Sequence, residues 1–471
     1  MEVIQIKTKN DASFIPVRLP HILSYLGIIV FFVSFCFNVS TVSLVYLLPL
    51  SYSISMRMVQ RCYANRFGLS LIIIEITKFC RFVVLPLFIT FEKKFQGVNI
   101  APQYENQAVL LMIYEIISVS VVLFYIGQKK IVNHEEKSLA RKIESFGWIS
   151  KALIAFWFFL LFTNERLKYK LFNFSLAIKE EIIEQYTTVQ HIDGVTKVFF
   201  AIGIVFLFSY ILSILQKIPL DNSIKFIVSV VVCVGFVSCL WTSGTGVSRW
   251  NMLIGVILSV YALLFYFPKY RNRIIGLGGG GFIFVIVVGS FLKTISFGFD
   301  STIESSMRMY FSSQYFDEYF QGVRSTSNCI FVALNHKYEM DPIKAVIMDY
   351  CTNVPYLIKF LGYTDHLATE YYWTTSGHYD LIIPTVTVSL MRFGEFLSPL
   401  YSCFAVFAAF YVEKKMFFED SLTGKLIYIY IIFWFSLFMC IGPNIVDGNC
   451  WSYVIGIIIL TIERNLLKTR T

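Results

Sequence analysis

Four arginines lie in the polar segments between apolar runs: Arg249 in a short one, and Arg308, Arg324 and Arg392 in a long one. A guanidinium binds two oxygens of a phosphate at once, and the free N–H groups of a helix N-terminus strengthen such a site. Arg249 belongs to the polar segment SGTGVSRW at 243–250, where it is expected to open a helix. The arginines therefore indicate a phosphate-bearing ligand. The alternative for each is contact with lipid headgroups or solvent.

Candidate proton acceptors gather in the segment SGHYD at 376–380. His378 titrates near neutral pH and Asp380 is ionised unless it is buried, so either can take a proton from an attacking hydroxyl group. Glu395 and Asp317 are further candidates. A surface histidine without a catalytic role is the alternative interpretation of His378.

No metal or cofactor is expected. His336, His366 and His378 are not spaced as metal ligands, and we find no pair of aspartates suited to a divalent ion. The positive charge of a site in this chain would therefore come from arginines.

The elements that carry these residues are predicted to be membrane helices. Of the 471 residues 56% are hydrophobic and 15% are charged, which is too apolar for one soluble core. The apolar runs predict about twelve spans, at 21–37, 40–56, 68–91, 108–127, 147–164, 198–215, 225–242, 250–267, 274–292, 397–412, 426–441 and 449–463. The Gly-rich segment 276–281 lies within a span and lacks the Lys and Ser or Thr of a phosphate loop, which favours close helix packing.

Lysines and arginines orient the spans, because positive residues in short connections stay on the cytoplasmic side. Clusters at 57–66, 129–142 and 269–273 predict that both termini are cytoplasmic and that the long loop faces outward. The resulting organisation is a bundle over 1–292, a large outer loop over 293–396, and a final bundle segment over 397–471. The net charge of +9 follows from this topology, in which basic residues are attracted to anionic inner-leaflet lipids, and no nucleic-acid partner is expected.

The outer loop is predicted to be partly helical. Ser301 and Glu304 form a capping box, and apolar residues then recur at helical spacing as far as Gly322. Asp341 followed by Pro342 predicts the start of a second helix, and 355–361 predicts a third that ends at Gly362. Their apolar faces favour helices lying on the outer membrane surface. Two cysteines of the loop, Cys329 and Cys351, could pair in an oxidising compartment.

Ionisable residues also occur within the predicted spans. Glu75, Lys78 and Arg81 lie three residues apart in the third span, with Glu115 as a partner in the fourth. Charges at bilayer depth are costly, so they are expected to pair and to face the protein interior. A structural ion pair between the two spans is the first interpretation, and a proton or ion relay is the second.

This layout resembles the O-antigen polymerases, the oligosaccharide repeat unit polymerases of the Wzy type in bacterial inner membranes. The resemblance covers essentially the whole chain. It rests on the many spans, the late outer loop with its arginines and histidine, the Gly/Ser-Arg element at 243–250, and the segments VPYLIKFLG (354–362) and IIPTVTVSLMRFGEFL (382–397). The plan is also similar to that of O-antigen ligases and membrane-embedded peptidoglycan polymerases.

The resemblance implies an all-α polytopic bundle like that of GT-C polymerases and ligases. It implies a metal-independent glycosyltransferase, without a cofactor, that uses undecaprenyl-diphosphate-linked oligosaccharides as donor and acceptor at the periplasmic face. By this similarity Arg249, Arg308 and Arg324 bind the diphosphate, with Arg392 in reserve, and His378 or Asp380 assists deprotonation. A chain-length regulator and a flippase are expected partners. An O-antigen ligase and a lipid-linked oligosaccharide flippase or other transporter are the alternatives; few charges within the spans and no two related halves speak against a transporter.

Overall fold

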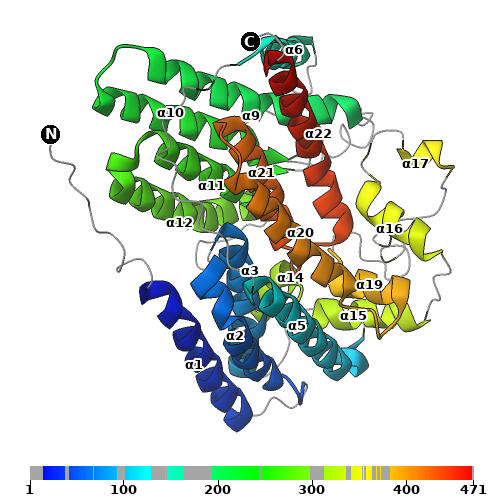
Figure 1. The fold of residues 1–471 in the computed structure, drawn as a ribbon. Coiled ribbons are helices and arrows are strands. Elements are labelled where there is room, and N and C mark those ends of the chain that lie inside the picture. Colours follow the sequence, from blue (N-terminus) through cyan, green and yellow to red (C-terminus); the bar gives the residue numbers. More distant parts are fainter. Residues whose placement is uncertain are drawn as a thin grey trace. The chain divides into compact units, whose positions relative to one another are not determined.

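The structure of the protein, a computed structural model, is built almost entirely of helices (Figure 1). It describes residues 14–37, 42–66, 68–92, 101–128, 144, 146–163, 194–243, 246–247, 249–296, 312–335, 341–352, 354, 357–362, 368, 372 and 382–468. The chain divides into two compact units, each described here by itself. Unit 1 contains Met1–His134, Phe311–Glu413 and Ile432–Asp447, and unit 2 contains Glu135–Tyr310, Lys414–Ile431 and Gly448–Thr471.

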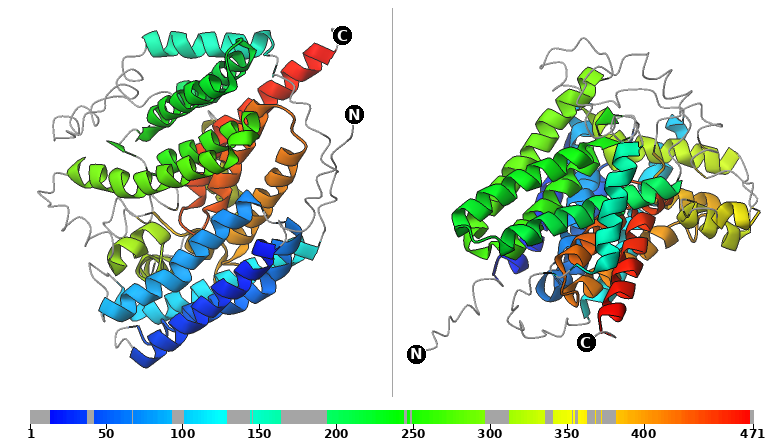
Figure 2. Two further views of the ribbon diagram at one scale, coloured as in Figure 1. Left: turned by 90° about the vertical axis from the view of Figure 1, so that its left-hand side faces the viewer. Right: turned by 90° about the horizontal axis from the view of Figure 1, so that it is seen from above.

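Unit 1 starts with long helices that lie side by side. α2 (Leu47–Arg66) packs against both α1 (Phe14–Phe37) and α5 (Glu105–Gln128). α1 and α2 remain neighbours in the turned views of Figure 2. Between α2 and α5 the chain forms α3 (Leu69–Phe79), the π-helix η1 (Cys80–Val84), α4 (Leu85–Glu92) and the 3-10 turn η2 (Pro102–Tyr104).

Apart from residues 293–296, the described part of the outer loop also belongs to unit 1. It forms α14 (Ser313–Phe320), α15 (Val323–Asn335), α16 (Pro342–Cys351), α17 (Leu357–Phe360) and α19 (Thr385–Phe393). α14 contacts α4 and η1, and α15 contacts α5, η2 and α19. The loop helices α14 and α15 therefore fold onto the apolar helices of the unit.

Two of the predicted loop helices are confirmed in detail. α16 begins at Pro342, and the carboxylate of Asp341 accepts the backbone N–H groups of Ile343 at 2.8 Å and Lys344 at 3.3 Å. α17 is followed by Gly362, whose φ of 66° is easily adopted by glycine alone. The predicted capping box at 301–304 lies outside the described residues.

Unit 2 is a series of helices in which each packs on the next. α6 (Trp148–Thr163), α9 (Gly194–Lys217), α10 (Asn222–Trp241), α11 (Arg249–Tyr266) and α12 (Arg271–Ser296) follow one another. A short antiparallel ladder of β1 (Thr242–Ser243) and β2 (Gly246–Val247) joins α10 to α11, and η3 (Pro268–Tyr270) precedes α12. α20 (Leu400–Phe417), α21 (Leu422–Ser436) and α22 (Pro443–Lys468) each contribute to both units.

Several helices have the length and composition of membrane spans, so the protein is of the helical membrane type. Within the described residues five qualify: Arg18–Phe37, Pro102–Gln128, Val198–Lys217, Asn222–Leu240 and Pro443–Leu467. A sixth is obtained if Trp250–Tyr266 and Pro268–Val285, between which the chain bends by 118°, form one broken span. This criterion does not reach the predicted count of twelve spans, although every predicted range overlaps a helix.

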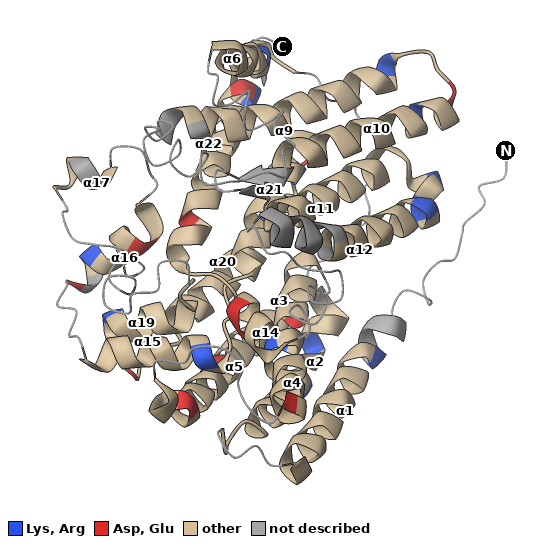
Figure 3. Ribbon diagram, turned by 180° about the vertical axis from the view of Figure 1, so that it is seen from behind, with Lys and Arg blue, Asp and Glu red and all other residues tan. Residues whose placement is uncertain are grey.

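Some predicted spans do not meet the length and composition criterion, for reasons that their helices show. α6 and α21 have 16 and 15 residues, which is short for a straight crossing. The predicted third span is divided into α3, η1 and α4, and it carries Glu75, Lys78 and Arg81. Figure 3 shows charged positions in the first turns of α10 and α12, and also beside α3 and α14.

Carboxylates of distant helices cap several helix starts, and glycines make room for them. Glu413 accepts the backbone N–H and the hydroxyl of Ser70 at the start of α3. Glu463 accepts the same two groups of Ser150 in the first turn of α6. A Cβ on Gly68 or Gly147 would overlap the respective glutamate. These contacts satisfy amides that a helix leaves without internal partners.

The Gly-rich segment 276–281 packs as predicted at two of its glycines only. An added Cβ would lie 2.7 Å from Val260 at Gly278 and 3.3 Å from Val256 at Gly281, both on α11. Gly279 and Gly280 have no neighbour within 4 Å in the described structure. Close packing thus involves one face of α12.

Candidate functional site

α14 and α15 form a helical hairpin whose turn is held by Asp317. Gln321 ends α14 in the left-handed conformation with φ 49°. The Asp317 carboxylate then accepts the backbone N–H groups of Arg324 at 2.9 Å and Ser325 at 2.8 Å, and the Ser325 hydroxyl at 2.7 Å. A Cβ on Gly322 would lie 2.6 Å from this carboxylate. One side chain of α14 therefore caps the first turn of α15, and Asp317 is committed to this contact.

The cap is buried, which affects its chemistry. Asp317 is 1% exposed, and burial raises its pKa although the hydrogen bonds from Arg324 and Ser325 oppose the rise. As a free proton acceptor Asp317 would have to give up bonds to two helix amides. Its structural role as a cap explains its position better than the catalytic role considered from sequence.

The first two turns of α15 are unusual because polar residues are buried on every side of the helix. Seven consecutive residues are at most 7% exposed: Val323, Arg324, Ser325, Thr326, Ser327, Asn328 and Cys329. Within the described structure the Thr326 hydroxyl and both amide atoms of Asn328 have no hydrogen-bond partner. Buried polar atoms without partners are costly, so such groups commonly mark sites that bind water or a ligand. Arg324 begins this polar stretch.

A second buried arginine lies on α19 and is held by α16. Arg392 donates from Nε to Oδ2 of Asp349 at 2.9 Å and from Nη2 to Oδ1 at 2.8 Å. The Tyr401 hydroxyl donates to Oδ2 of Asp349 at 3.0 Å. The Asp349 and Arg392 side chains are 3% and 1% exposed. This geometry orients the guanidinium.

An aromatic and aliphatic cluster holds the two arginine-bearing helices together. Cys329 and Val332 of α15 pack with Val388 of α19, Tyr401 of α20 and Tyr372. α15 and α19 thus form one packed body, and the structure brings the helices that carry Arg324 and Arg392 into contact.

The two loop cysteines do not form a disulfide in this structure. Cys329 and Cys351 are both free thiols. Burial raises the pKa of Cys329 to about 12, so its thiol stays protonated and unreactive near neutral pH. Cys329 serves as a small apolar core residue.

The ionisable residues of the predicted third span form buried pairs, as expected. Lys78 contacts Glu75 at 2.7 Å within α3, and Arg81 contacts Glu115 of α5 at 2.7 Å. Ser402 of α20 donates to the other oxygen of Glu115 at 2.6 Å. The predicted ion pair between the third and fourth spans is therefore confirmed.

The remaining predicted site residues are Arg249, Arg308, His378 and Asp380. Arg249 is the first residue of α11, as predicted, but it belongs to unit 2, whereas Arg324 and Arg392 belong to unit 1. Arg308, His378 and Asp380 lie outside the described residues. Their roles stay predictions.

Some features of the site were not foreseen from sequence. The Asp349 partner of Arg392 and the cap at Asp317 join residues 43 and 7 positions apart. The Asp317 cap has a local signal, since an acidic residue precedes a Gly and a Ser-rich helix start. Asp349 has none.

Among the residues that the structure describes, no group of three His, Cys, Asp or Glu side chains is arranged as a metal site. Comparisons of the chain with protein-family models, with curated proteins and with solved structures find no match.

Proposed function

We propose that this protein is a glycosyltransferase of the bacterial inner membrane that polymerises lipid-linked oligosaccharides into a surface polysaccharide such as the O-antigen of lipopolysaccharide. Donor and acceptor are both carried on undecaprenyl diphosphate, and the bundle is of the GT-C-like type. The observation that supports this best is the polar start of α15, which is buried within unit 1 and carries Arg324. An outer loop folded into apolar helices can hold a polar group close to a lipid-anchored substrate.

The chemistry assigns a role to each class of residue. The acceptor hydroxyl attacks the anomeric carbon of the donor, the new glycosidic bond forms, and the bond from that carbon to the diphosphate breaks. Arg249, Arg308 and Arg324, with Arg392 in support, stabilise the negative charge that develops on the departing diphosphate. His378 or Asp380 takes the proton of the acceptor hydroxyl. Asp349 keeps the guanidinium of Arg392 in one orientation.

Deletion of the gene that encodes this protein, followed by analysis of the surface glycan, tests this activity. Loss of a polymerase leaves single repeat units on the lipid core, loss of a ligase leaves no repeat units there, and loss of a flippase stops export. Only the first outcome supports the proposal. The second would favour the O-antigen ligase.

Complementation with single variants then tests the arginines. R249A, R308A and R324A are expected to leave short chains at normal protein levels. The matched control is R273A, because Arg273 is exposed near the start of α12. Full-length polysaccharide from all three variants would remove these arginines from the proposal.

A lipid-linked oligosaccharide flippase or another transporter is the second candidate function. The buried pairs Glu75–Lys78 and Arg81–Glu115 favour it, because ionisable groups inside membrane bundles often line substrate or proton paths. The deletion experiment separates the two candidates, since accumulation of repeat units on the cytoplasmic side is expected only of a flippase.

The proposed sidedness places both termini in the cytoplasm, and the alternation of spans on which it rests is supported by contacts inside unit 1. The predicted alternation of spans assigns Ser70 and Glu413 to one side, and Glu92 and Ser313, which are also hydrogen-bonded, to the other. Cysteines introduced at Phe396, which is 81% exposed, and at the exposed Asp420 test it in a cysteine-free background. An impermeant maleimide added to spheroplasts should label the first and spare the second. The reverse pattern would invert the topology.

A further inference from the structure

Arg81 is a buried arginine in a π-helix of unit 1. It lies in the π-helix η1, within the predicted third span, and its side chain is 0% exposed. Its Nη1 atom donates to Glu115, which Ser402 also contacts. Single-turn π-helices are rare, and they occur frequently at functional sites.

The opposite edge of the same guanidinium is unused by the protein. Among the described residues, none accepts a hydrogen bond from Nε or Nη2 of Arg81. In Arg392 these same two atoms bind both oxygens of Asp349. The partly exposed Arg464 also uses two nitrogens, which bind the two oxygens of Glu419. Arg81 thus presents, in the protein interior, the two-donor edge that matches two oxygens on one atom.

The charges around Arg81 determine what net charge a ligand can bring to this site. Lys78 and Glu75 form one pair, and Arg81 and Glu115 form the other, so their four formal charges cancel. A bound monoanion would leave an uncompensated charge unless a proton accompanied it, because isolated buried charges are strongly unfavourable. Oε2 of Glu75 has no hydrogen-bond partner among the described residues and is available to hold that proton.

Glu75 is well placed for this role. Among the described residues, the ionisable groups that interact electrostatically with it are Lys78 on its own helix and the hydroxyls of Tyr52 and Tyr63 on α2. Tyr52 is 0% exposed, and its ring also contacts the Lys78 ammonium at 5.9 Å from the ring centre. These groups are neutral or cationic, so none of them opposes the approach of an anion.

We propose that the Nε and Nη2 edge of Arg81 binds a singly charged oxyanion, a phosphate or a carboxylate, in the interior of unit 1, together with one proton on Glu75. This site is independent of the polymerase function proposed above. The oxyanion is either a free anion or the phosphate of a lipid headgroup, which share this chemistry.

Calorimetric titration of the full chain in neutral maltoside micelles at pH 6 tests the proposal. The probes are inorganic phosphate and a short-chain prenyl monophosphate. Binding of both identifies a free-anion site, and binding of the prenyl phosphate alone identifies a lipid headgroup. In either case R81K, which keeps the charge and loses the two-donor edge, is expected to weaken binding about tenfold or more.

R464K is the matched control, because Arg464 uses its donors on Glu419 in unit 2, and it should bind as the native chain does. If R81K fails to fold, the double variant R81M/E115L removes the ion pair without leaving a lone charge and should also lose binding. The probes themselves lose a second proton near neutral pH, so affinities are calculated for their singly charged forms. In the native chain this affinity should fall as the pH rises, whereas E75Q should make it independent of pH. No binding of either probe, binding unaffected by R81K, or an unchanged pH profile in E75Q would overturn the proposal. None of these results bears on glycan length, so the two proposals fail separately.

Discussion

Asp349 on α16 and Arg392 on α19 are joined by two nearly equal contacts of 2.9 and 2.8 Å, and both side chains are almost completely buried. The pair connects a loop helix with the segment that leads into α20. Because charge is buried on both sides, removal of one partner is far more harmful than removal of both. This asymmetry makes the structural and functional roles of Arg392 separable.

D349L alone is expected to destabilise the protein by about 3–5 kcal/mol, because it leaves the Arg392 guanidinium buried without its carboxylate. The double variant D349L/R392M should recover most of that loss. Thermal unfolding in detergent measures both. A double variant as unstable as the single one would show that the loss of the Asp349–Arg392 pair does not explain the destabilisation.

Glycan analysis of the same variants addresses function. If Arg392 supports the diphosphate, D349L/R392M should be stable and yet produce short chains. Stable protein with normal chain length would leave Arg392 with a structural role alone.

The hydrogen bonds of Asp317 predict a local defect in the loop. D317A removes the acceptor for the first amides of α15 in a buried site, and a loss of about 2 kcal/mol or more is expected. E318A, one position later on the half-buried side of α14, is the control and should change stability by about 0.5 kcal/mol or less. Hydrogen exchange of the α15 amides should increase in D317A only. Equal exchange in both variants would contradict the capping role.

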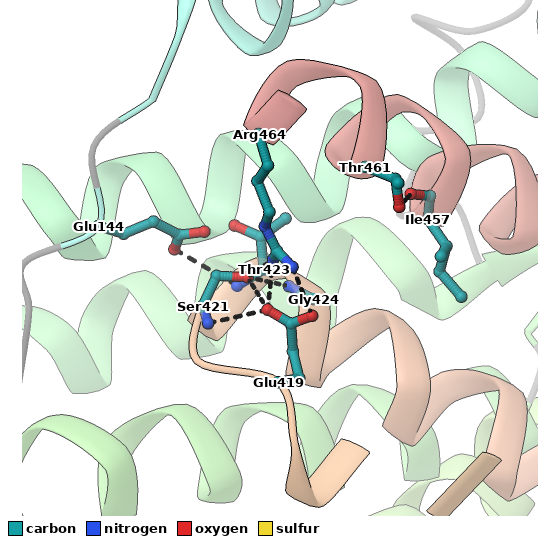
Figure 4. A network of polar contacts seen from close by, with 8 residues as sticks. All are labelled: Glu144, Glu419, Ser421, Thr423, Gly424, Ile457, Thr461 and Arg464. Carbon is teal, nitrogen blue, oxygen red and sulfur yellow. Dashed lines mark hydrogen bonds and ion pairs between the residues drawn. The ribbon is translucent and has the colours of Figure 1, made fainter. Parts of the chain in front are cut away.

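Glu144 makes the stability of unit 2 depend on pH (Figure 4). Burial raises its pKa to about 7, although the N–H of Thr423, at 3.3 Å, opposes the rise. The folded state therefore binds the proton more tightly than the unfolded chain, whose glutamate has a pKa near 4.5. The stabilisation, about 3 kcal/mol at most, is complete below pH 4.5 and is lost as the pH rises through 7.

E144Q should remove this contribution, so the difference in unfolding temperature between native chain and variant should change from pH 5 to pH 8. The neighbouring Glu419 is the contrast. Burial favours a higher pKa, but hydrogen bonds from Arg464 and Ser421 prevail and lower it, so Glu419 stays ionised over this range. A constant difference across the range would refute the assignment to Glu144.

Two glycine substitutions in unit 2 separate close approach from helix flexibility. G147A places a methyl group against the Glu463 carboxylate that caps α6, and it is expected to cost about 1–3 kcal/mol. G279A adds the same group where nothing lies within 4 Å, and it should leave stability unchanged or raise it by up to about 1 kcal/mol. Unfolding in detergent compares them. Equal effects would show that the carboxylate contact does not decide the outcome.

The sequence by itself determined the elements whose signals are local. Length and hydropathy predicted apolar helices long enough to cross a membrane, because lipid requires long apolar segments with internal hydrogen bonds, and five such helices are found among the described residues. Asp341 with Pro342 predicted the start of α16, and Gly362 the end of α17, because caps depend on a few adjacent residues. The ion pair of Arg81 with Glu115 followed from the cost of lone charges in a span.

Only the tertiary structure decided which distant groups meet. Asp349 gives no sign in the sequence that it will hold Arg392, since that contact depends on how α16 packs against α19. The division of the third span into α3, η1 and α4 is likewise a result of packing, as an apolar run has the same composition in either form of helix. The capping of α3 by Glu413 joins residues 343 positions apart. Hydropathy fixes where a helix lies along the chain, whereas partner choice depends on the shapes and charges that several helices present together.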